Sequence, residues 1–360
     1  MKVVHFTSWA PRQSGMYESV KDQIKYERKA GLTSDFCDPH KKYEEGRKEI
    51  DDGWLQAIPH KLAGEADVWV MHAYLPESIK KDFAKKATVA ILHGPNEHML
   101  LKEWTSGRAN SAFNLHITIM WQYGATVALN SHEYDILKLY DEKERLCYIP
   151  NSIDLERYKS DYTWPFQHHP AIGSFDVPRL EKLPAHIIWA MTRIAEKLPE
   201  ARLNLYSLTL EPIGTWRNIF ARSKDRRLQT LCENIQLECN DLRPFMKGID
   251  IGFNNNISGI ASRVTMEMMA MSKPVISYGG DYTDYIARIW DLDSIAAQVV
   301  RCWGDLQKDP VGVSKRVRKF AAQNFDREVH VKTYIRMYET MLGKPQVVVP
   351  EKIKPKEKHG

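Results

Sequence analysis

The stretch Gly248–Tyr285, GIDIGFNNNISGIASRVTMEMMAMSKPVISYGGDYTDY, decides which fold we expect for the chain. Its apolar runs predict a short strand at Ile249–Phe253 and a second strand at Val275–Tyr278. A helix is expected between them, from apolar residues at helical spacing: Val264, Met268 and Met271. The second strand runs into Gly279-Gly280, whose backbone can approach a ligand closely. Open α/β sheets use this order of elements to build a nucleotide site at the carboxyl ends of their strands.

The same alternation of strand and helix extends over most of the 360 residues. Nearly continuous apolar runs predict the strands of a parallel sheet that is covered on both faces. In the first half we expect strands at Val3–Thr7, Ala66–Tyr74, Ala87–Gly94 and Gly124–Asn130, and a strand followed by a turn within Leu146–Tyr158. Helices are expected at about Tyr17–Lys29, Pro76–Lys86, Asn110–Trp121 and His132–Tyr140. In the second half we expect further strands at Ala171–Phe175, Ala201–Leu208 and Asn234–Cys239, and helices at about Pro184–Lys197 and Leu292–Trp303. From Val313 the pattern is helical, with an interruption at Phe325-Asp326 and a last amphipathic helix that ends near Leu342.

This pattern predicts an α/β protein of two Rossmann-like domains that face each other across a cleft. We expect the N-terminal domain at residues 1–160 and the C-terminal domain at 161–324, with the aromatic, Pro-rich segment Thr163–Pro170 near their junction. Residues 325–342 are expected to form a C-terminal helix. The Lys- and Pro-rich residues 343–360 are expected to be a disordered basic tail.

Composition narrows the class of protein. Hydrophobic residues make up 43% and charged residues 27%, as in an ordinary soluble globular protein. Apolar runs stay far below the roughly 18 residues that span a bilayer, so we expect no transmembrane segment and a cytoplasmic location. The five cysteines are scattered without a Cys-x-x-Cys pair, which argues against a disulfide framework or a zinc site. The net charge of +5 owes much to the tail, which holds five lysines and two glutamates, so charge alone gives little support for nucleic-acid binding.

Several motifs in a fixed order resemble one family. Ile149–Asp154 (IPNSID) resembles the I-P-N-G-[IV]-D turn at the domain junction of retaining glycosyltransferase family four (glycosyl transferases group 1), with Ser152 where Gly is usual. Thr265–Tyr285 resembles the L-E-A-M-A-x-G-x-P-V-I stretch of that family and the Gly-Gly loop that follows it. Further segments that match in order are Asn130–Tyr140, Leu198–Ser207 and Asn234–Asn256. The resemblance covers nearly the whole chain and implies the GT-B fold, with the last helix crossing back to the N-terminal domain.

The resemblance also implies an activity. Such enzymes transfer a sugar, here a hexose-type unit, from a nucleoside-diphosphate sugar with retention at the anomeric carbon. They usually need no bound metal or cofactor. The donor is expected on the C-terminal domain and the acceptor, which is a glycan, lipid, small molecule or modified nucleic acid, on the N-terminal domain. Electrostatic stabilisation of the diphosphate leaving group is expected to carry most of the rate.

Glu267 matches the second glutamate of the family's paired-glutamate motif, which accepts hydrogen bonds from the donor ribose. The alternative is a salt bridge with Arg263, one helical turn earlier. The first glutamate is missing, because Gly259 occupies its position. Donor contacts are therefore expected from the residues around that glycine: Ser258, Gly259, Ile260, Ala261 and Arg263.

Cations are expected at the diphosphate. Lys182 matches the family's diphosphate-binding lysine, whereas Ser174 replaces its arginine and Arg179 is a candidate to supply the missing charge. A solvated charge pair with Glu181 is the alternative for both cations. Glycines that let the backbone approach the donor are expected in two loops, at Gly15 and at Gly279-Gly280, although turn geometry alone also explains the second pair.

His93 matches the family's N-domain histidine, which contacts the transferred sugar or the acceptor, and we place it with Lys182, Arg179 and Glu267 as a catalytic candidate. The acceptor candidates are His72, which ends the preceding strand, and Glu97 and His98. A structural role is the alternative for each histidine.

Two other functions stay open. The missing glutamate and arginine are also compatible with a degenerate relative that binds a nucleotide sugar without transferring it. The basic run Arg217–Arg227 and the Lys-rich tail can contact an anionic surface weakly, so a transferase whose acceptor is DNA is the third possibility. Charge runs are more often solvated faces.

Overall fold

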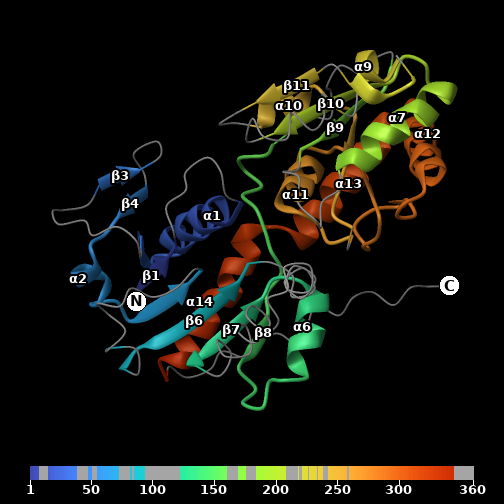
Figure 1. Ribbon diagram of the computed structural model, residues 1–360. Helices are drawn as coiled ribbons and strands as arrows, with labels where there is room; N and C mark the ends of the chain where they lie inside the picture. Colours follow the sequence, from blue (N-terminus) through green and yellow to red (C-terminus); the bar gives the residue numbers. More distant parts are fainter. Residues whose placement is uncertain are drawn as a thin grey trace.

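The computed structural model describes residues 1–7, 15–38, 48–50, 55–72, 82, 85–93, 122–159, 169–175, 184–207, 218, 221–225, 227–232, 234–237, 242–257 and 259–343. Its strands form two separate sheets, and helices cover them (Figure 1). We call the part built on the first sheet the N-terminal domain and the part built on the second sheet the C-terminal domain.

The sheet of the N-terminal domain has the strand order β3-β4-β2-β1-β5-β6-β7-β8. All neighbouring strands are parallel except β3 and β4. The strands are β1 (Lys2–Phe6), β2 (Thr33–Cys37), β3 (Lys48–Ile50), β4 (Leu55–Ala57), β5 (Val68–Met71), β6 (Ala87–Leu92), β7 (Ala125–Ala128) and β8 (Leu146–Tyr148). The described helices of this domain are α1 (Gly15–Lys29), α2 (His60–Ala63) and α6 (Ser131–Lys138).

The sheet of the C-terminal domain is parallel throughout, in the order β11-β10-β9-β12-β13-β14. Its strands are β9 (Ala171–Ser174), β10 (Arg202–Ser207), β11 (Asn234–Leu237), β12 (Ile251–Phe253), β13 (Val275–Ser277) and β14 (Tyr285–Ile286). Its described helices are α7 (Pro184–Lys197), α9 (Arg227–Leu231), α10 (Arg243–Lys247), α11 (Arg263–Ala270), α12 (Leu292–Lys308) and α13 (Pro310–Asn324). The order reverses at β9, so the carboxyl ends of β9 and β12 mark the switch point where ligands of such sheets bind.

Two apolar cores hold the C-terminal domain together. On one side of its sheet, α7 and α12 pack on each other and bury side chains such as Ile187, Met191 and Val299. On the other side α11 packs on α13, and a second core there includes Met266 and Met269.

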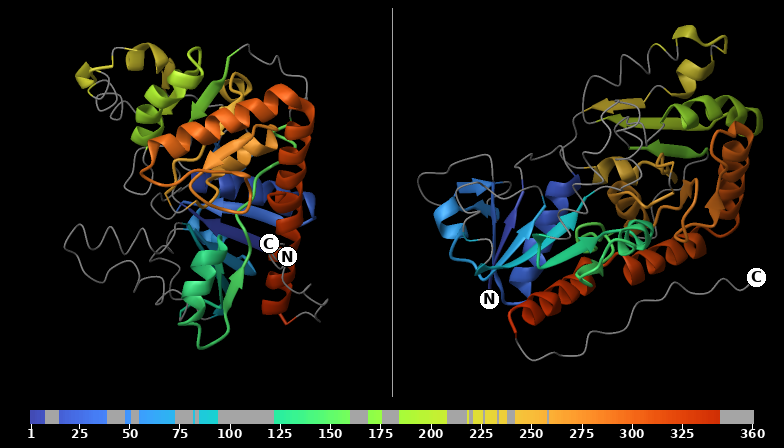
Figure 2. Two further views of the ribbon diagram at one scale, coloured as in Figure 1. Left: turned by 90° about the vertical axis from the view of Figure 1, so that its right-hand side faces the viewer. Right: turned by 60° about the horizontal axis from the view of Figure 1, so that its bottom comes forward.

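The last helix, α14 (Arg327–Met341), belongs by its contacts to the N-terminal domain. Its Tyr334 and Tyr338 are buried in one core with Val3 and Val89 of the first sheet. Backbone hydrogen bonds join the two segments that connect the domains, from Ile153 N to Phe325 O at 2.9 Å and from Arg327 N to Ile153 O at 3.0 Å. The right-hand view of Figure 2 shows α13 and α14 running one after the other along both domains. The expected return of the chain to the N-terminal domain is thus confirmed, whereas the expected domain boundaries stay a prediction.

Most expected strands and helices are present with somewhat different bounds. The helix expected from Tyr17 begins at Gly15, and the one expected to end at Trp303 continues to Lys308. The helices expected at about 76–86 and 110–121 lie outside the described residues. Among the described residues, no helix has both the length and the apolar character needed to cross a membrane.

The strands that we did not expect are β2, β3, β4 and β14. The reason is clearest in β2, because its sequence TSDFC lacks a continuous apolar run. Its buried Ser34 donates a hydrogen bond to Glu27 at 2.6 Å, and its Asp35 accepts one from Arg28 at 2.9 Å. Partners on α1 therefore allow a polar strand to lie inside the sheet.

Candidate active site between the two domains

Two glycine loops of the C-terminal domain pack against each other through their backbones. Gly259 has φ = 71°, and a Cβ atom there would lie 2.7 Å from Cα of Gly279. Gly280 has φ = 94°, and a Cβ atom there would lie 2.8 Å from the carbonyl oxygen of Gly259. Positive φ and the close approach both require glycine at these two positions. The structure thus gives a physical reason why a glutamate does not occupy position 259.

Three buried asparagines, Asn254–Asn256, lead from β12 into the first of these loops. The side chain of Asn254 donates hydrogen bonds to Ile260 O at 3.0 Å and to the Tyr282 hydroxyl at 2.7 Å. The side chain of Asn255 donates to Ser174 Oγ at 2.8 Å, at the carboxyl end of β9. Neutral side-chain amides therefore fix the shape of the loop, and Ser174 is buried as part of that framework.

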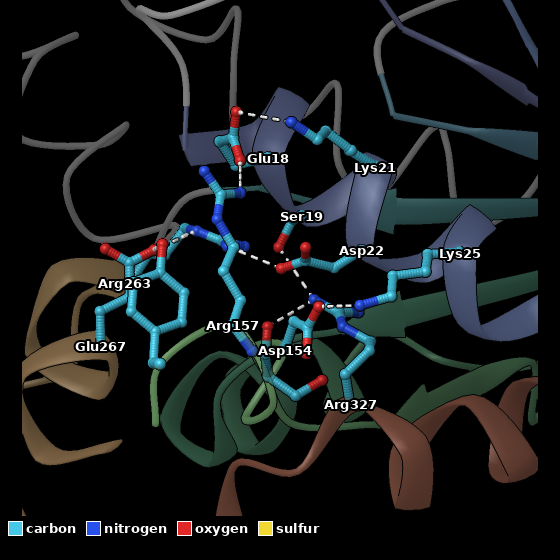
Figure 3. Close-up of polar contacts among 12 residues, drawn as sticks. Glu18, Ser19, Lys21, Asp22, Lys25, Asp154, Arg157, Arg263, Glu267 and Arg327 are labelled. Atoms are coloured by element: carbon cyan, nitrogen blue, oxygen red, sulfur yellow. Dashed lines mark hydrogen bonds and ion pairs between the residues drawn. The ribbon is translucent and has the colours of Figure 1, made fainter. Parts of the chain in front are cut away.

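Helix α11 begins directly after the loop. Ser262 is its N-cap, with Oγ accepting a hydrogen bond from Thr265 N at 3.2 Å. One turn further along, Glu267 is buried, with 3% of its surface exposed. Its Oε1 accepts hydrogen bonds from Arg263 Nε at 2.7 Å and from the Tyr158 hydroxyl at 2.8 Å (Figure 3). The helical salt bridge that we gave as an alternative role for Glu267 is therefore present.

Arg263 also joins the two domains. Its Nη2 lies 2.6 Å from Asp22 Oδ2 of α1 (Figure 3); the Asp22 side chain is buried, and 9% of the Arg263 side chain is exposed. Gly15, the first residue of α1, lies beside the same side chain, since a Cβ atom on Gly15 would be 3.8 Å from Arg263 Cδ. Near them, Arg157 pairs with Glu18 at 2.7 Å. The start of α1 and the start of α11 thus form one polar contact between the domains.

Protonation in this contact is set by burial and by the pairing of opposite charges. Burial raises the pKa of Glu267, and the nearby guanidinium of Arg263 opposes that shift. Burial alone lowers the pKa of Arg263, but Asp22 and Glu267 outweigh it and the pKa is raised well above its usual value. The arginine is therefore a permanent cation between two carboxylates.

The histidine candidates lie at the carboxyl edge of the N-terminal sheet. His72 directly follows β5, and His93 directly follows β6. Nδ1 of His72 and Nε2 of His93 are hydrogen-bonded at 2.7 Å. Burial, followed by the charge of Arg327, lowers the pKa of His93 to about 3, so its imidazole is neutral near pH 7.

No protein-family model matches the chain, and no curated protein matches it by sequence. Solved structures do match over nearly the full length. A glycosyltransferase from Rickettsia africae superposes with a TM-score of 0.72 at 14% identity, covering 96% of this chain and 99% of the other. Sucrose-phosphate synthase from Thermosynechococcus elongatus gives 0.74 at 12% identity, covering 95% and 99%. HepE from Anabaena, solved with UDP-glucose, gives 0.70 at 15% identity, covering 94% and 100%.

The chain has the GT-B fold. This confirms the fold class expected from the sequence, whereas the assignment to family four within GT-B proteins stays a prediction.

Of the expected site residues, the GT-B structure brings Gly15, Arg263 and Glu267 together where the domains meet. Gly259, Ile260, Ala261, Gly279 and Gly280 form the adjoining loops. Outside the described residues lie Arg179, Lys182, Ser258, Glu97 and His98, together with Arg217, Arg226 and residues 344–360 of the tail. In the described part of the basic run, Arg227 pairs with Asp225 at 2.7 Å on the surface.

Sequence reasoning missed several residues of this region. Tyr158 lies just beyond the IPNSID motif, and its contact with Glu267 spans 109 positions. Asp22 contacts Arg263 across 241 positions, and Glu27 lies deep in the N-terminal domain. In the sequence, the only signal for a role of Asp22 and Glu27 was their position within a helix whose polar residues otherwise look solvent-exposed.

Proposed function

We propose that the chain is a glycosyltransferase that uses a nucleoside-diphosphate sugar as its donor. The observation that carries this proposal is the GT-B likeness over about 95% of the chain to glycosyltransferases, including one solved with UDP-glucose. The glycine loops at the switch point of the C-terminal sheet add to it, because backbone amides beside a helix N-terminus suit a diphosphate.

Glu267 is the proposed ribose contact. Only its Oε1 is hydrogen-bonded to described residues, by Arg263 and Tyr158. Its Oε2 makes no hydrogen bond within the described part of the chain, which leaves one carboxylate oxygen for a ribose hydroxyl. The salt bridge and the ribose contact are compatible, since Arg263 orients the carboxylate that the nucleotide would use.

The remaining roles follow the resemblance. Lys182 and Arg179 are proposed to neutralise the departing diphosphate, and His93 to contact the transferred sugar or the acceptor. We further propose transfer with retention and without a metal ion. Ser174 is the weakest of the donor-site candidates, because its hydroxyl already accepts a hydrogen bond from Asn255.

Calorimetry with UDP, GDP and ADP tests the donor site. We expect one nucleotide to bind to the wild type, and Glu267→Gln to weaken that binding about 10-fold or more, as the loss of a charged acceptor implies. Asp22→Asn is the matched control, because it disturbs the same ion-pair cluster from the other domain and leaves the carboxylate of Glu267 in place. If none of the nucleotides binds, the proposed function is wrong. If Glu267→Gln binds as tightly as the wild type, Glu267 has a structural role only.

Incubation of the matching labelled nucleotide sugar with candidate acceptors tests transfer. The anomeric coupling constant of the product reports retention or inversion, and added EDTA reports metal dependence. Binding without transfer to any glycan, lipid, small-molecule or DNA acceptor would favour a degenerate relative.

A further inference from the structure

A chain of three histidines runs through the N-terminal domain behind His93. His5 of β1, His72 after β5 and His93 after β6 come from three adjacent parallel strands. Nδ1 of His5 lies 2.9 Å from Nε2 of His72, and Nδ1 of His72 lies 2.7 Å from Nε2 of His93. At the inner end, Nε2 of His5 lies 2.8 Å from Oε2 of Glu27. His5 and Glu27 are fully buried, His72 is nearly so, and His93 at the sheet edge is partly exposed.

Glu27 determines which ring nitrogens donate and which accept hydrogen bonds along the three histidines. Its Oε2 accepts hydrogen bonds from His5 and from Ser34 at 2.6 Å. Its Oε1 accepts them from Gln23 at 3.1 Å and from Tyr338 at 3.0 Å. Four donors satisfy an ionised carboxylate: burial raises the pKa of Glu27, and the hydrogen bonds from His5, Ser34 and Gln23 help to lower it below its usual value. Nε2 of His5 therefore carries a proton.

When all three histidines are neutral, the proton positions on His72 and His93 follow from the Nε2 proton of His5. Because Nε2 of His5 is protonated, Nδ1 of neutral His5 must accept a hydrogen bond from Nε2–H of His72. Nδ1 of His72 must accept in the same way from Nε2–H of His93. The outer nitrogen, Nδ1 of His93, is left as an acceptor, and within the described residues nothing hydrogen-bonds it.

We propose that His93, His72 and His5 form a proton relay that carries a proton from a substrate hydroxyl inward to the side of Glu27. The hydroxyl O–H bond breaks, and a bond to Nδ1 of His93 forms. The Nε2 proton of His93 then passes to Nδ1 of His72, and the Nε2 proton of His72 passes to Nδ1 of His5. His5 ends as an imidazolium 2.8 Å from the Glu27 carboxylate, and the hydroxyl oxygen is left as the nucleophile.

The charges around the relay favour this end point. Burial, followed by the other histidines and Arg327, lowers the pKa of His72, and burial with Arg327 lowers that of His93. Arg327 of α14 acts on the outer histidines, and Gln23 of α1, Ser34 of β2 and Tyr338 of α14 bond to Glu27 at the inner end. Asp22 of α1 and Tyr334 of α14 act in turn on Arg327. A positive charge is thus disfavoured at the outer two rings, whereas at the inner end the Glu27 carboxylate lies 2.8 Å from Nε2 of His5.

The relay is distinct from a metal centre. All ring nitrogens of the three histidines except Nδ1 of His93 are hydrogen-bonded to a neighbouring ring or to Glu27, and no group of metal-ligating side chains among the described residues is arranged to hold an ion. His93 contacts the substrate in this proposal, whereas His72, His5 and Glu27 act through it.

Histidine-selective ¹⁵N NMR tests the protonation pattern without any substrate. At pH 8 we expect all three histidines as Nε2–H tautomers, with Nδ1 of each ring unprotonated. A protonated Nδ1 on His93 at pH 8 would overturn the relay.

The kinetic test uses His72→Gln, because a glutamine amide can accept from His93 and donate to His5 but cannot pass a proton on. We expect kcat to fall about 10²-fold, with the donor KM within about threefold of the wild-type value. We also expect the acid limb of the pH profile of kcat to differ from that of the wild type. His330→Gln is the control for a buried histidine outside the relay, since His330 bonds only the carbonyl of Pro150 among the described residues. Unchanged kcat and pH profile in His72→Gln would contradict the proposal.

The use of the relay in sugar transfer rests on the proposed function, but its tautomers do not. If the wild type binds no nucleotide, the proposed function fails while the NMR experiment still decides whether the relay exists.

Discussion

The two sheets contribute different chemical groups to the region where the domains meet. At the N-terminal sheet the groups are titratable side chains, from Asp22 and Glu27 on α1 to the histidines at the strand ends. At the C-terminal sheet the loops that follow the strands are built from backbone and neutral amides, with Gly259 packed on Gly279 and Asn254 bonded to Ile260. The histidines can change charge with pH, whereas these loops cannot. The charged groups of the C-terminal side, Arg263 and Glu267, lie on α11 and not in the loops.

We expect the largest effect from a variant that disrupts the backbone packing between the two glycine loops of the C-terminal domain. Gly259→Glu restores the family's glutamate, but it places a side chain at φ = 71° and against Gly279. A left-handed backbone for such a residue costs about 1–2 kcal/mol and overpacking about 1–3 kcal/mol, so we expect about 2–5 kcal/mol less free energy of unfolding. Urea denaturation measures the loss.

Gly279→Ala is the control for that variant. A Cβ atom on Gly279 would meet only Cα of Gly259, at an ordinary 3.7 Å. We expect a change of less than about 1 kcal/mol. Equal losses in the two variants would show that the contact does not explain the absence of the glutamate.

The next effect concerns the charge pair that joins the two sides. Asp22→Asn removes the charge that faces Arg263 and leaves the arginine with Glu267. We expect a loss of about 1–3 kcal/mol in unfolding free energy, because the bond is buried and charged. Glu328→Gln removes a pair of similar length, Lys29–Glu328 at 2.7 Å, but both of its partners are exposed to solvent. That control should cost less than about 1 kcal/mol, and a similar cost for both would mean that burial does not matter here.

The histidines of the N-terminal domain should make the free energy of unfolding depend on pH. The pKa of His93 is lowered to about 3 in the folded protein, so between that value and its ordinary 6.5 the unfolded chain binds a proton that the folded chain does not. Stability must therefore fall as the pH falls below 6.5, by up to about 1.4 kcal/mol per pH unit for this histidine. His93→Gln should show a shallower slope between pH 6 and 4 and the same slope as the wild type above pH 7.5. Thermal unfolding over that pH range checks the prediction, and identical slopes below pH 6 would refute it.

The smallest effect lies in the segment that connects the two sides. The hydroxyl of Ser152 is buried and has no hydrogen-bond partner among the described residues, although the backbone oxygen of Ser152 accepts from Arg327 at 2.5 Å. Ser152→Ala removes the unsatisfied hydroxyl and keeps the backbone contact, so we expect a gain of up to about 1 kcal/mol. A clear loss of stability would show that the hydroxyl has a partner that the described residues do not include.

The sequence was sufficient for most of the elements and their order, because strand and helix periodicity are local properties. The Gly-Gly loop and the helix of Glu267 were predicted from short stretches, and the return of the chain after Phe325 was implied by the family resemblance. What failed was the pairing of distant residues. Neither the contact of Gly259 with Gly279 nor the use of Asp22 and Glu27 can be deduced from spacing, since each depends on how separate elements meet. Likewise, β2 escaped prediction because partners on α1 compensate its polar residues.

The doubled connection between the domains has a mechanical consequence. The segments at Ile153 and Phe325–Arg327 are hydrogen-bonded to each other, so the domains are joined by two adjacent connections that must move together. The Asp22–Arg263 pair lies close to these connections, since the charge of Asp22 also acts on Arg327. Motion that separates α1 from α11 has to break this pair, and a ligand that competes for Arg263 would therefore remove one of the contacts between the domains.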